Sequence, residues 1–268
     1  MNPVLGEVAK HDIAFADGAT FRSVWEQCEH HPPVTANWCE GDEIVVAGNV
    51  QPKPHLVGAH VEVALAGYVQ FIIKRRDETY EASMPSFEWR FFPRWYSRMT
   101  PDATFVLKCE KTGFEAELKY STKHSCHHIK GVIRSLGAGN AVAYVVDGRY
   151  DGKVFAKRYG VVGAESEPPR LLYDAEEFLR LGESGEDKKR WSLIKRHDDA
   201  RDTEKVWAEC FAAMDRNDWD AAKTAKRRVE DAERRARRSR AERGETWCPK
   251  YFSRDVSTGR WVRNDVPT

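Results

Sequence analysis

The chain has 268 residues, enough to bury a sizeable core as one large all-β unit with helices or as two domains. Its 43 lysines and arginines nearly balance its 42 aspartates and glutamates, so any basic partner surface must come from local clustering. Six cysteines without a CxxC pair predict reduced thiols in a cytoplasmic protein, and the lack of a signal pattern or of an apolar run near 18 residues predicts membrane contact that is only peripheral.

Two adjacent histidines and two prolines, His30-His31-Pro32-Pro33, predict an unusual corner near the start of the chain. Pro32 disfavours the helical conformation for His31, and neither proline has an amide hydrogen, so we expect the sheet ladder to be interrupted here. Two imidazoles side by side suit an anion such as a phosphate, or a metal. The residues alone leave a third interpretation open, namely two satisfied polar side chains at the end of a strand.

From residue 20 to about residue 160, short apolar-rich runs alternate with turn residues, as in an antiparallel barrel or sandwich. The run from Phe114 to Tyr120 alternates apolar and charged residues, which buries one face of a strand and exposes the other. At least eight strands without an intervening helix predict a closed or nearly closed sheet. The other predicted strands are Glu43–Val50, His55–Ala66, Tyr68–Lys74, Thr104–Glu110, Ile129–Leu136, Asn140–Asp147 and Lys153–Tyr159.

Helical patterns dominate the last third of the chain. A short helix is predicted at Tyr173–Leu181, a charged linker at Gly185–Arg190, and a long helix from Asp218 to about Arg243 with no proline or glycine inside. The long helix carries ten lysines and arginines against four acidic residues between positions 223 and 243. That excess fits a solvated helix or docking to anionic lipid, whereas no zinc module, RRM pattern or recognition-helix motif supports nucleic-acid binding.

Three segments together resemble one known family. The octapeptide Glu26–Pro33 resembles the Glu-Gln-Val-Ser-His-His-Pro-Pro signature of the lipid-binding domain of oxysterol-binding proteins, with Cys28 and Glu29 in place of valine and serine. Residues 2–7 (Asn-Pro-Val-Leu-Gly-Glu) are similar to the family's Asn-Pro-Leu-Leu-Gly-Glu segment, and residues 247–252 (Trp-Cys-Pro-Lys-Tyr-Phe) to its Trp-x-Pro-Lys-Phe-Phe close. The order and spacing of these motifs, from residue 2 to about residue 262, make the resemblance specific.

The resemblance implies a mainly β fold: a large antiparallel, near-complete β-barrel with an apolar tunnel, followed by a C-terminal helical region. We therefore expect a lipid-binding core at residues 1–165 and a helical subdomain at 166–268 that closes against it, forming one ligand-binding domain. Because a single residue precedes Asn2, the family's N-terminal lid is expected to be lacking.

The same resemblance implies lipid binding and transfer between membranes, with phosphatidylinositol 4-phosphate exchanged for sterol or phosphatidylserine. The partners would be these membrane lipids and anionic membrane surfaces, with no cofactor and no nucleic acid. The alternative is a phosphoinositide-responsive sensor or scaffold that binds lipid without transferring it. The residues that the resemblance assigns to the phosphoinositide are Asn2, His30, His31, Lys226, Glu230 and Arg234.

The long helix places three of these residues in one row. Lys226, Glu230 and Arg234 lie four positions apart, so they follow each other along one face. An ion-pair ladder within the helix, contributing about 0.2–0.5 kcal/mol per pair, is the alternative interpretation. If the histidines bind a phosphate as cations, headgroup affinity should strengthen as pH falls from about 8 to 6.

Two further functions are weighed and not favoured. Residues 123–128 (Lys-His-Ser-Cys-His-His) could bind zinc, but no second ligand pair has suitable spacing, although His30 and His31 could come near in the fold. We expect a polar inter-strand loop there and no metal. The absence of GxSxG, P-loop and HExxH motifs predicts no catalytic residues and no enzyme, and a zinc-dependent hydrolase would require both metal content and turnover.

Overall fold

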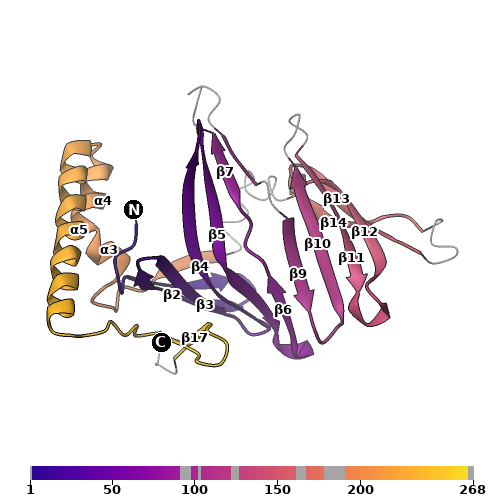
Figure 1. Ribbon diagram of the computed structural model, residues 1–268, viewed down its shortest axis with the longest axis horizontal. Coiled ribbons are helices and arrows are strands. Elements are labelled where there is room, and N and C mark those ends of the chain that lie inside the picture. The colour runs from indigo at the N-terminus through magenta and orange to yellow at the C-terminus, as the bar shows by residue number, and fades with distance from the viewer. Residues whose placement is uncertain are drawn as a thin grey trace. The chain divides into compact units, whose positions relative to one another are not determined.

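The structure is a computed structural model that describes residues 2–90, 98–101, 104–121, 127–160, 167–177 and 191–264. The fold is mainly β, with a large antiparallel sheet of 15 strands and a few C-terminal helices (Figure 1), so the predicted fold class is confirmed. No helix within the described ranges is long and apolar enough to cross a membrane. Closure of the sheet around an apolar tunnel stays a prediction.

The chain divides into two compact units. One unit contains Met1–Asp42, Ala47–Asn49 and Leu193–Thr268, and the other contains Glu43–Val46 and Val50–Ser192. The first unit therefore joins the N-terminal strands to the C-terminal helices. The expected division into residues 1–165 and 166–268 remains a prediction.

In the first unit, three antiparallel strands precede the helices in sequence. Among the described residues, three helices and then a small two-stranded sheet follow toward the C-terminus. The helices are labelled in Figure 1. The bounds are β1 Val8–Phe15, β2 Thr20–His30, β3 Pro33–Glu40, α3 Thr203–Val206, α4 Ala208–Asp215, α5 Trp219–Glu242, β16 Phe252–Arg254 and β17 Trp261–Arg263. Strand β15, Trp191–Lys195, contains residues of both units.

Helix α5 confirms the predicted long helix almost residue for residue. Asp218 is its N-cap, and the aspartate side chain accepts the backbone N–H of Ala221 at 3.0 Å. The helix packs through the small buried residues Ala222 and Ala225 against Trp207 and the neighbouring helix α4. Small side chains on this face allow a close approach, which leaves the charged faces of α5 available to other contacts.

A second core of this unit lies beneath β2. Val24 and Cys28 of β2 pack with Val8 of β1, and with Tyr251 and Phe252 near the C-terminus. The sheet thus buries one face against the last segment of the chain.

The second unit is an antiparallel array of strands, and its described residues include the short 3₁₀ turns η1 Lys74–Arg76 and η4 Leu136–Ala138. Its small core gathers Ile129, Val146 and Val154 with Ala156. The strands are β4 Ile44–Val57, β5 His60–Ile73, β6 Glu78–Ala82, β7 Phe87–Arg90, β8 Arg98–Pro101, β9 Thr104–Cys109, β10 Phe114–Ser121, β11 His128–Ser135, β12 Ala141–Arg149, β13 Lys153–Arg158 and β14 Arg170–Asp174. Ala47–Asn49 of β4 belong to the first unit.

Several predicted boundaries need correction. Strand β4 continues to Val57 through Pro52 and Pro54, because proline suits extended backbone and ends a strand only where its missing N–H is needed. The predicted strand His55–Ala66 is divided, since residues 55–57 end β4 and residues 60–66 begin β5, which continues through Gly67 into the next predicted strand. The helix predicted from Tyr173 is wrong at its start, since β14 extends to Asp174 and only residues 175–177 are helical before the described range ends. The predicted linker Gly185–Arg190 lies outside the described residues.

Candidate functional site

The two histidines lie at a tight hairpin of the first unit. Strand β2 ends at His30, strand β3 begins at Pro33, and these two residues are Cα partners, with His31 and a cis-linked Pro32 between them. The expectation that both prolines interrupt the ladder is therefore wrong for Pro33. Proline is tolerated as the first residue of a strand, where its missing N–H breaks no ladder hydrogen bond.

A β-bulge precedes this hairpin. In the β2–β3 register Gln27 faces Thr35 and Glu29 faces Val34, so Cys28 has no opposite Cα in β3. One extra residue shifts the alternation of side chains by one position, and His30 therefore leaves the face that buries Cys28. Burial raises the pKa of the Cys28 thiol, which keeps it a protonated, small apolar group of the core.

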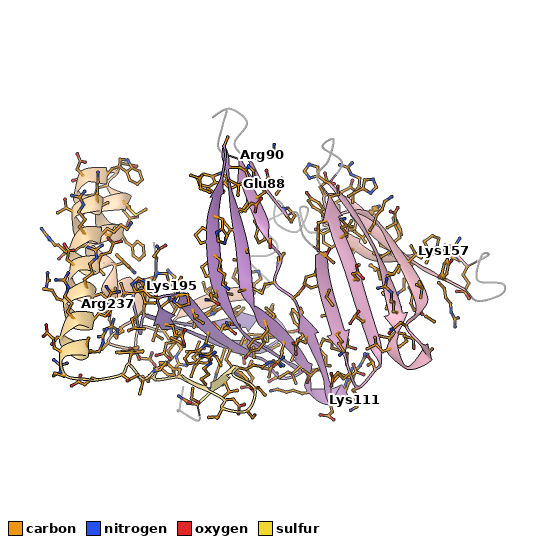
Figure 2. The ribbon with its side chains drawn as sticks, viewed as in Figure 1. Glu88, Arg90, Lys111, Lys157, Lys195 and Arg237 are labelled. Atoms are coloured by element: carbon orange, nitrogen blue, oxygen red, sulfur yellow. The ribbon has the colours of Figure 1, made fainter. Side chains whose placement is uncertain are left out.

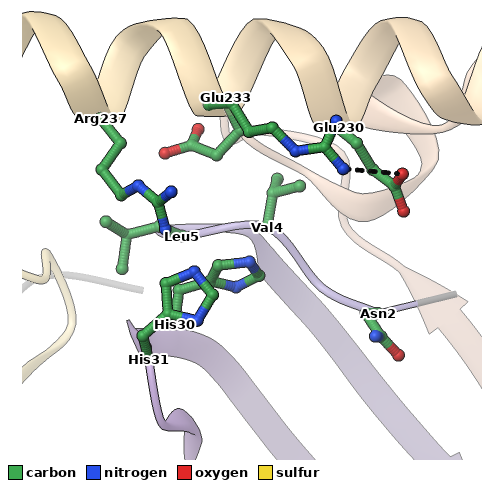
Figure 3. A pocket seen from close by; sticks show the side chains of 9 residues that line it. Asn2, Val4, Leu5, His30, His31, Glu230, Glu233 and Arg237 are labelled. Carbon is green, nitrogen blue, oxygen red and sulfur yellow. Dashed lines mark ion pairs between the residues drawn. The ribbon is translucent and has the colours of Figure 1, made fainter.

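A pocket of about 340 Å³ lies between this hairpin, the N-terminal segment and α5 (Figure 3). It brings together Asn2, His30 and His31 with Glu230 and Arg234, that is, five of the six residues predicted from the sequence. The sixth, Lys226, is not among the lining residues. The full lining is Asn2, Val4, Leu5, His30, His31, Glu230, Glu233, Arg234 and Arg237.

The predicted row on α5 is an ion-pair ladder in this structure. Glu230 lies 3.4 Å from the Nζ of Lys226 and 3.7 Å from Arg234, and Arg234 also donates to Asp231 at 2.5 Å. These side chains are partly exposed, so each pair contributes only a few tenths of a kcal/mol. The ladder and a ligand role are compatible, because weak exposed pairs rearrange at little cost when an anion binds.

Two charged lining residues, Glu233 and Arg237, were missed by the sequence analysis. Glu233 is largely buried and accepts from two arginines, Arg201 at 3.1 Å and Arg240 at 2.7 Å. Both missed residues lie three positions after a predicted one on the same helix. Residues three positions apart are neighbours on a helix surface, so the helical period could have predicted both.

The same two arginines hold Trp247, which belongs to the C-terminal motif. The guanidinium carbons of Arg201 and Arg240 each lie 5.4 Å from the centre of a Trp247 ring, within the range of a cation–π contact. Arg201 also donates to the carbonyl oxygen of Leu5. This arrangement ties the N-terminal segment to α5 behind the pocket.

Gly6 lies directly against this tryptophan. Its φ is +74°, and a Cβ atom at this position would approach within 2.2 Å of the Trp247 ring. Only glycine combines a left-handed backbone with so close a contact. The backbone of Gly6 also donates to the carbonyl of Gln27 at 2.8 Å, which fixes the segment to β2.

Glu7 organises the next turn of the N-terminal segment. Its carboxylate is buried and accepts from the backbone N–H of Val4 at 2.8 Å, from the indole of Trp207 at 2.9 Å and from the hydroxyl of Thr203 at 2.9 Å. Val4 and Leu5 reach the pocket because this carboxylate folds the segment back on itself.

A second buried carboxylate, that of Glu26, fixes the C-terminal segment beneath β2. It accepts the backbone N–H groups of Lys250 and Tyr251, each at 2.8 Å. Burial raises the pKa of Glu26, although these two hydrogen bonds act in the opposite direction.

Asp199 holds the side chains of the same two C-terminal residues. It accepts from the Nζ of Lys250 at 2.6 Å and from the hydroxyl of Tyr251 at 2.9 Å. Burial alone would raise its pKa, but these bonds, together with the backbone N–H of Arg201, outweigh burial and lower it. The C-terminal motif is thus held to the rest of the unit through main chain and side chains alike.

The histidines form a compact pair at the floor of the pocket. The rings of His30 and His31 lie 4.7 Å apart between centres in an edge-to-face arrangement. Burial lowers the pKa of His30, with further lowering by His31 and Arg237, which outweighs Glu233 and a hydrogen bond to the backbone of Pro3. His30 is therefore a neutral group at pH 7 unless a bound anion stabilises its charged form.

The second histidine cluster is only partly described. Residues 123–126 lie outside the described residues, and His127 places its Nδ1 2.8 Å from the hydroxyl of Tyr150. In the part of the chain that is described, no group of three or more potential ligands is gathered as a metal site requires.

Comparison with known proteins then decides the family. The profile of the family described as oxysterol-binding protein matches residues 1–266. The chain belongs to the oxysterol-binding protein family. The recognition of the family from its three motifs is therefore confirmed.

Curated relatives within this family are of low to moderate identity. Oxysterol-binding protein-related protein 4A of Arabidopsis thaliana is 29% identical over 268 residues, covering 94% of this chain and 63% of that protein. Oxysterol-binding protein-related protein 8 of Homo sapiens is 26% identical, covering 97% of this chain and 29% of that protein. The chain thus spans less than two thirds of the length of these relatives.

Solved structures of the family support the fold. The Osh1 ORD domain in complex with ergosterol has a TM-score of 0.77 at 17% identity, covering 99% of this chain and 68% of that one. The Osh3 ORD of Saccharomyces cerevisiae in complex with PI(4)P has a TM-score of 0.69 at 18% identity, with 99% and 69% covered. Oxysterol-binding domains related to this chain thus bind sterol in one case and PI(4)P in another.

Proposed function

We propose that this chain binds a phosphoinositide headgroup in the pocket of the first unit and transfers lipid between membranes without catalysing a reaction. Phosphatidylinositol 4-phosphate is the proposed headgroup ligand, and sterol or phosphatidylserine is the lipid exchanged for it. The observation that carries the proposal is the meeting of Asn2, His30 and His31 with Glu230 and Arg234 in one pocket, although about 200 positions separate the two groups in sequence.

The chemistry of the pocket supports a phosphorylated sugar. The guanidinium of Arg234 offers a planar fork for phosphate oxygens, and the two imidazoles add donors from the opposite wall. Glu230 can accept sugar hydroxyls while it orients its cationic neighbours. We propose that Lys226, which lies outside the lining, acts through Glu230 or joins the site when the ladder opens.

Docking to anionic membranes is the second part of the proposal. Several cations of α5 are exposed and make no ion pair within the described residues, and each cation near an anionic surface contributes about 1 kcal/mol. Trp219, which is 62% exposed at the start of the helix, adds a side chain that suits the membrane interface. The cations concerned are Lys223, Arg227, Arg235 and Arg238.

The decisive experiment is extraction of phosphatidylinositol 4-phosphate from liposomes by the wild type and by His30→Ala/His31→Ala. We expect extraction by the wild type and its loss in the double variant, whereas His55→Ala, an exposed histidine outside the pocket, should behave as the wild type. Equal extraction by the double variant would refute the site.

A lipid-transfer assay distinguishes a transfer protein from a sensor or scaffold. Donor and acceptor liposomes loaded with phosphatidylinositol 4-phosphate and with either sterol or phosphatidylserine should show counter-exchange of one of these pairs. Headgroup binding without transfer would identify a sensor or scaffold instead. If the protein binds to vesicles that contain anionic lipid and is released at high salt, this would support membrane docking through the exposed cations of α5.

A further inference from the structure

The row predicted on α5 is not the most direct source of positive charge in the pocket. Arg234 is engaged by Glu230 and Asp231, and Lys226 is engaged by the same Glu230. Arg237, one turn further along the helix, also lines the pocket. Among the described residues it makes no hydrogen bond and no ion pair.

The neighbouring carboxylate does not neutralise this arginine. Glu233, four positions before Arg237 in sequence, is occupied by Arg201 and Arg240, one on each carboxylate oxygen. Both arginines are fixed behind the pocket by Trp247. The structure thus provides Glu233 with partners of its own and leaves the charge of Arg237 uncompensated.

Arg237 lies over the histidine pair. Figure 3 shows its side chain descending from α5 toward His30 and His31, and Figure 2 labels its place on the helix. The charge of Arg237 is close enough to His30 to disfavour a proton on that ring. Three nitrogen-bearing side chains therefore face one volume, and without an anion the charge of Arg237 helps to keep His30 neutral.

We propose that Arg237, together with His30 and His31, binds a phosphate monoester, and that this arginine is the main permanent cation of the headgroup site. A phosphate monoester carries about −1.5 to −2 charge at pH 7 and accepts at three oxygens, which matches one guanidinium fork and two imidazole donors. In this proposal the anion lies between Arg237 and His30, where it pairs with the guanidinium and favours a proton on the imidazole. The inference rests on the proposed headgroup site and extends it to a residue outside the predicted row.

Two sources can supply this group: the headgroup of a membrane phosphoinositide and a soluble inositol phosphate. Calorimetric titration with inositol 1,4-bisphosphate measures the second source, and extraction from liposomes measures the first. Both use the full chain as wild type, Arg237→Gln and Arg238→Gln. Arg238 is the matched control, because it is exposed on the same helix, makes no ion pair with described residues and does not line the pocket.

We expect Arg237→Gln to weaken binding of inositol 1,4-bisphosphate roughly 10- to 100-fold, since it removes charge-assisted hydrogen bonds from a partly enclosed site. Arg238→Gln should change it by less than about threefold. Titration of His30 by NMR in the ligand-free protein adds an independent readout: its pKa should rise in Arg237→Gln and stay unchanged in Arg238→Gln.

The outcomes separate this inference from the proposed function. If Arg237→Gln binds as tightly as the wild type, the proposed role of Arg237 is wrong, whereas the proposed headgroup site is not affected. Equal losses in both variants also overturn it, because they indicate a general basic potential. Arg237-dependent binding of the soluble ligand without extraction supports the inference and refutes lipid transfer, and a wild type that binds neither ligand refutes both.

Discussion

Glu26 of β2 and Tyr251 lie 225 positions apart in the sequence and are joined by a buried hydrogen bond of 2.8 Å between a carboxylate oxygen and a backbone N–H. The second carboxylate oxygen accepts the N–H of Lys250 at the same distance. One side chain, four residues before His30, therefore holds the C-terminal motif against the strand that carries the histidines. The family motif at residues 26–33 is thus structural at its start and suited to a ligand at its end.

Glu26→Gln is expected to destabilise the protein by about 1–3 kcal/mol, because an amide offers one acceptor where two backbone donors need one each. Urea denaturation measures the change in unfolding free energy. Glu209→Gln, which removes an exposed carboxylate paired with Arg228, is the control and should cost less than about 1 kcal/mol.

The effect of Glu26→Gln should depend on pH. The pKa of Glu26 is raised in the folded protein, so between about pH 4.5 and that raised value the folded state binds more protons than the unfolded state. Stability contributed by this group therefore falls as pH rises through the window. The advantage of wild type over Glu26→Gln should be larger at pH 4.5 than at pH 7, and an advantage that grows with pH would contradict burial as the dominant cause.

Asp199→Asn should have the opposite pH dependence. The pKa of Asp199 is lowered, so its contribution is present above about pH 3.8 and is lost as pH falls through the folded value. Near neutral pH we expect Asp199→Asn to lower the free energy of unfolding by about 1–3 kcal/mol, because it weakens the hydrogen bonds to Lys250 and Tyr251. This difference between the variant and the wild type should disappear in acid. Asp215→Asn, at an exposed site, should leave the denaturation midpoint unchanged at every pH.

Gly6→Ala should destabilise the first unit by about 2–5 kcal/mol, since it adds left-handed backbone strain to a clash with Trp247. Gly259→Ala isolates the first of these costs: its φ is +67° and no atom lies within 4 Å of the added Cβ, so a loss of about 1–2 kcal/mol is expected. Thermal unfolding of both variants makes the comparison, and equal losses would show that the tryptophan contact is unimportant.

The pH dependence of headgroup binding should be centred lower than an ordinary histidine would place it. The pKa of free His30 lies below 6.5, and a bound phosphate raises it, so binding takes up a proton between the two values. Affinity should therefore strengthen as pH falls, over a range that lies lower than the range an ordinary histidine would give. Calorimetry in buffers of different ionisation enthalpy measures the proton uptake, which His30→Ala should reduce.

The long helix and the histidine corner could be predicted from the sequence because their signals are local. Asp218, an uninterrupted helical composition and a helical period define α5 without any tertiary information. The partners of Glu233 could not be predicted in this way, since Arg201 reaches it from another segment. The same limit applies to Lys226: its spacing places it in one row with Glu230, but the row alone does not show whether its side chain reaches the pocket, and the lining does not include it.

The strand boundaries failed for a different physical reason. Prolines and glycines indicate local backbone preferences, whereas the length of a strand depends on hydrogen bonding with the neighbouring strand. Pro33 therefore starts a strand, and β4 continues past Pro52. Tertiary pairing overrides the local signal in both places.

The pocket is built from the first residues of the chain and from a helix more than two hundred residues later, and this imposes an order on its biosynthesis. At about 5–20 residues per second, a ribosome needs on the order of ten to forty seconds to add the roughly 200 residues between His31 and Arg237. During that interval the β2–β3 hairpin is already outside the ribosome without its helix and without the C-terminal residues that cap Glu26. A nascent chain of this protein therefore exposes the apolar face of β2 until Tyr251 and Phe252 have been synthesised and can cover it.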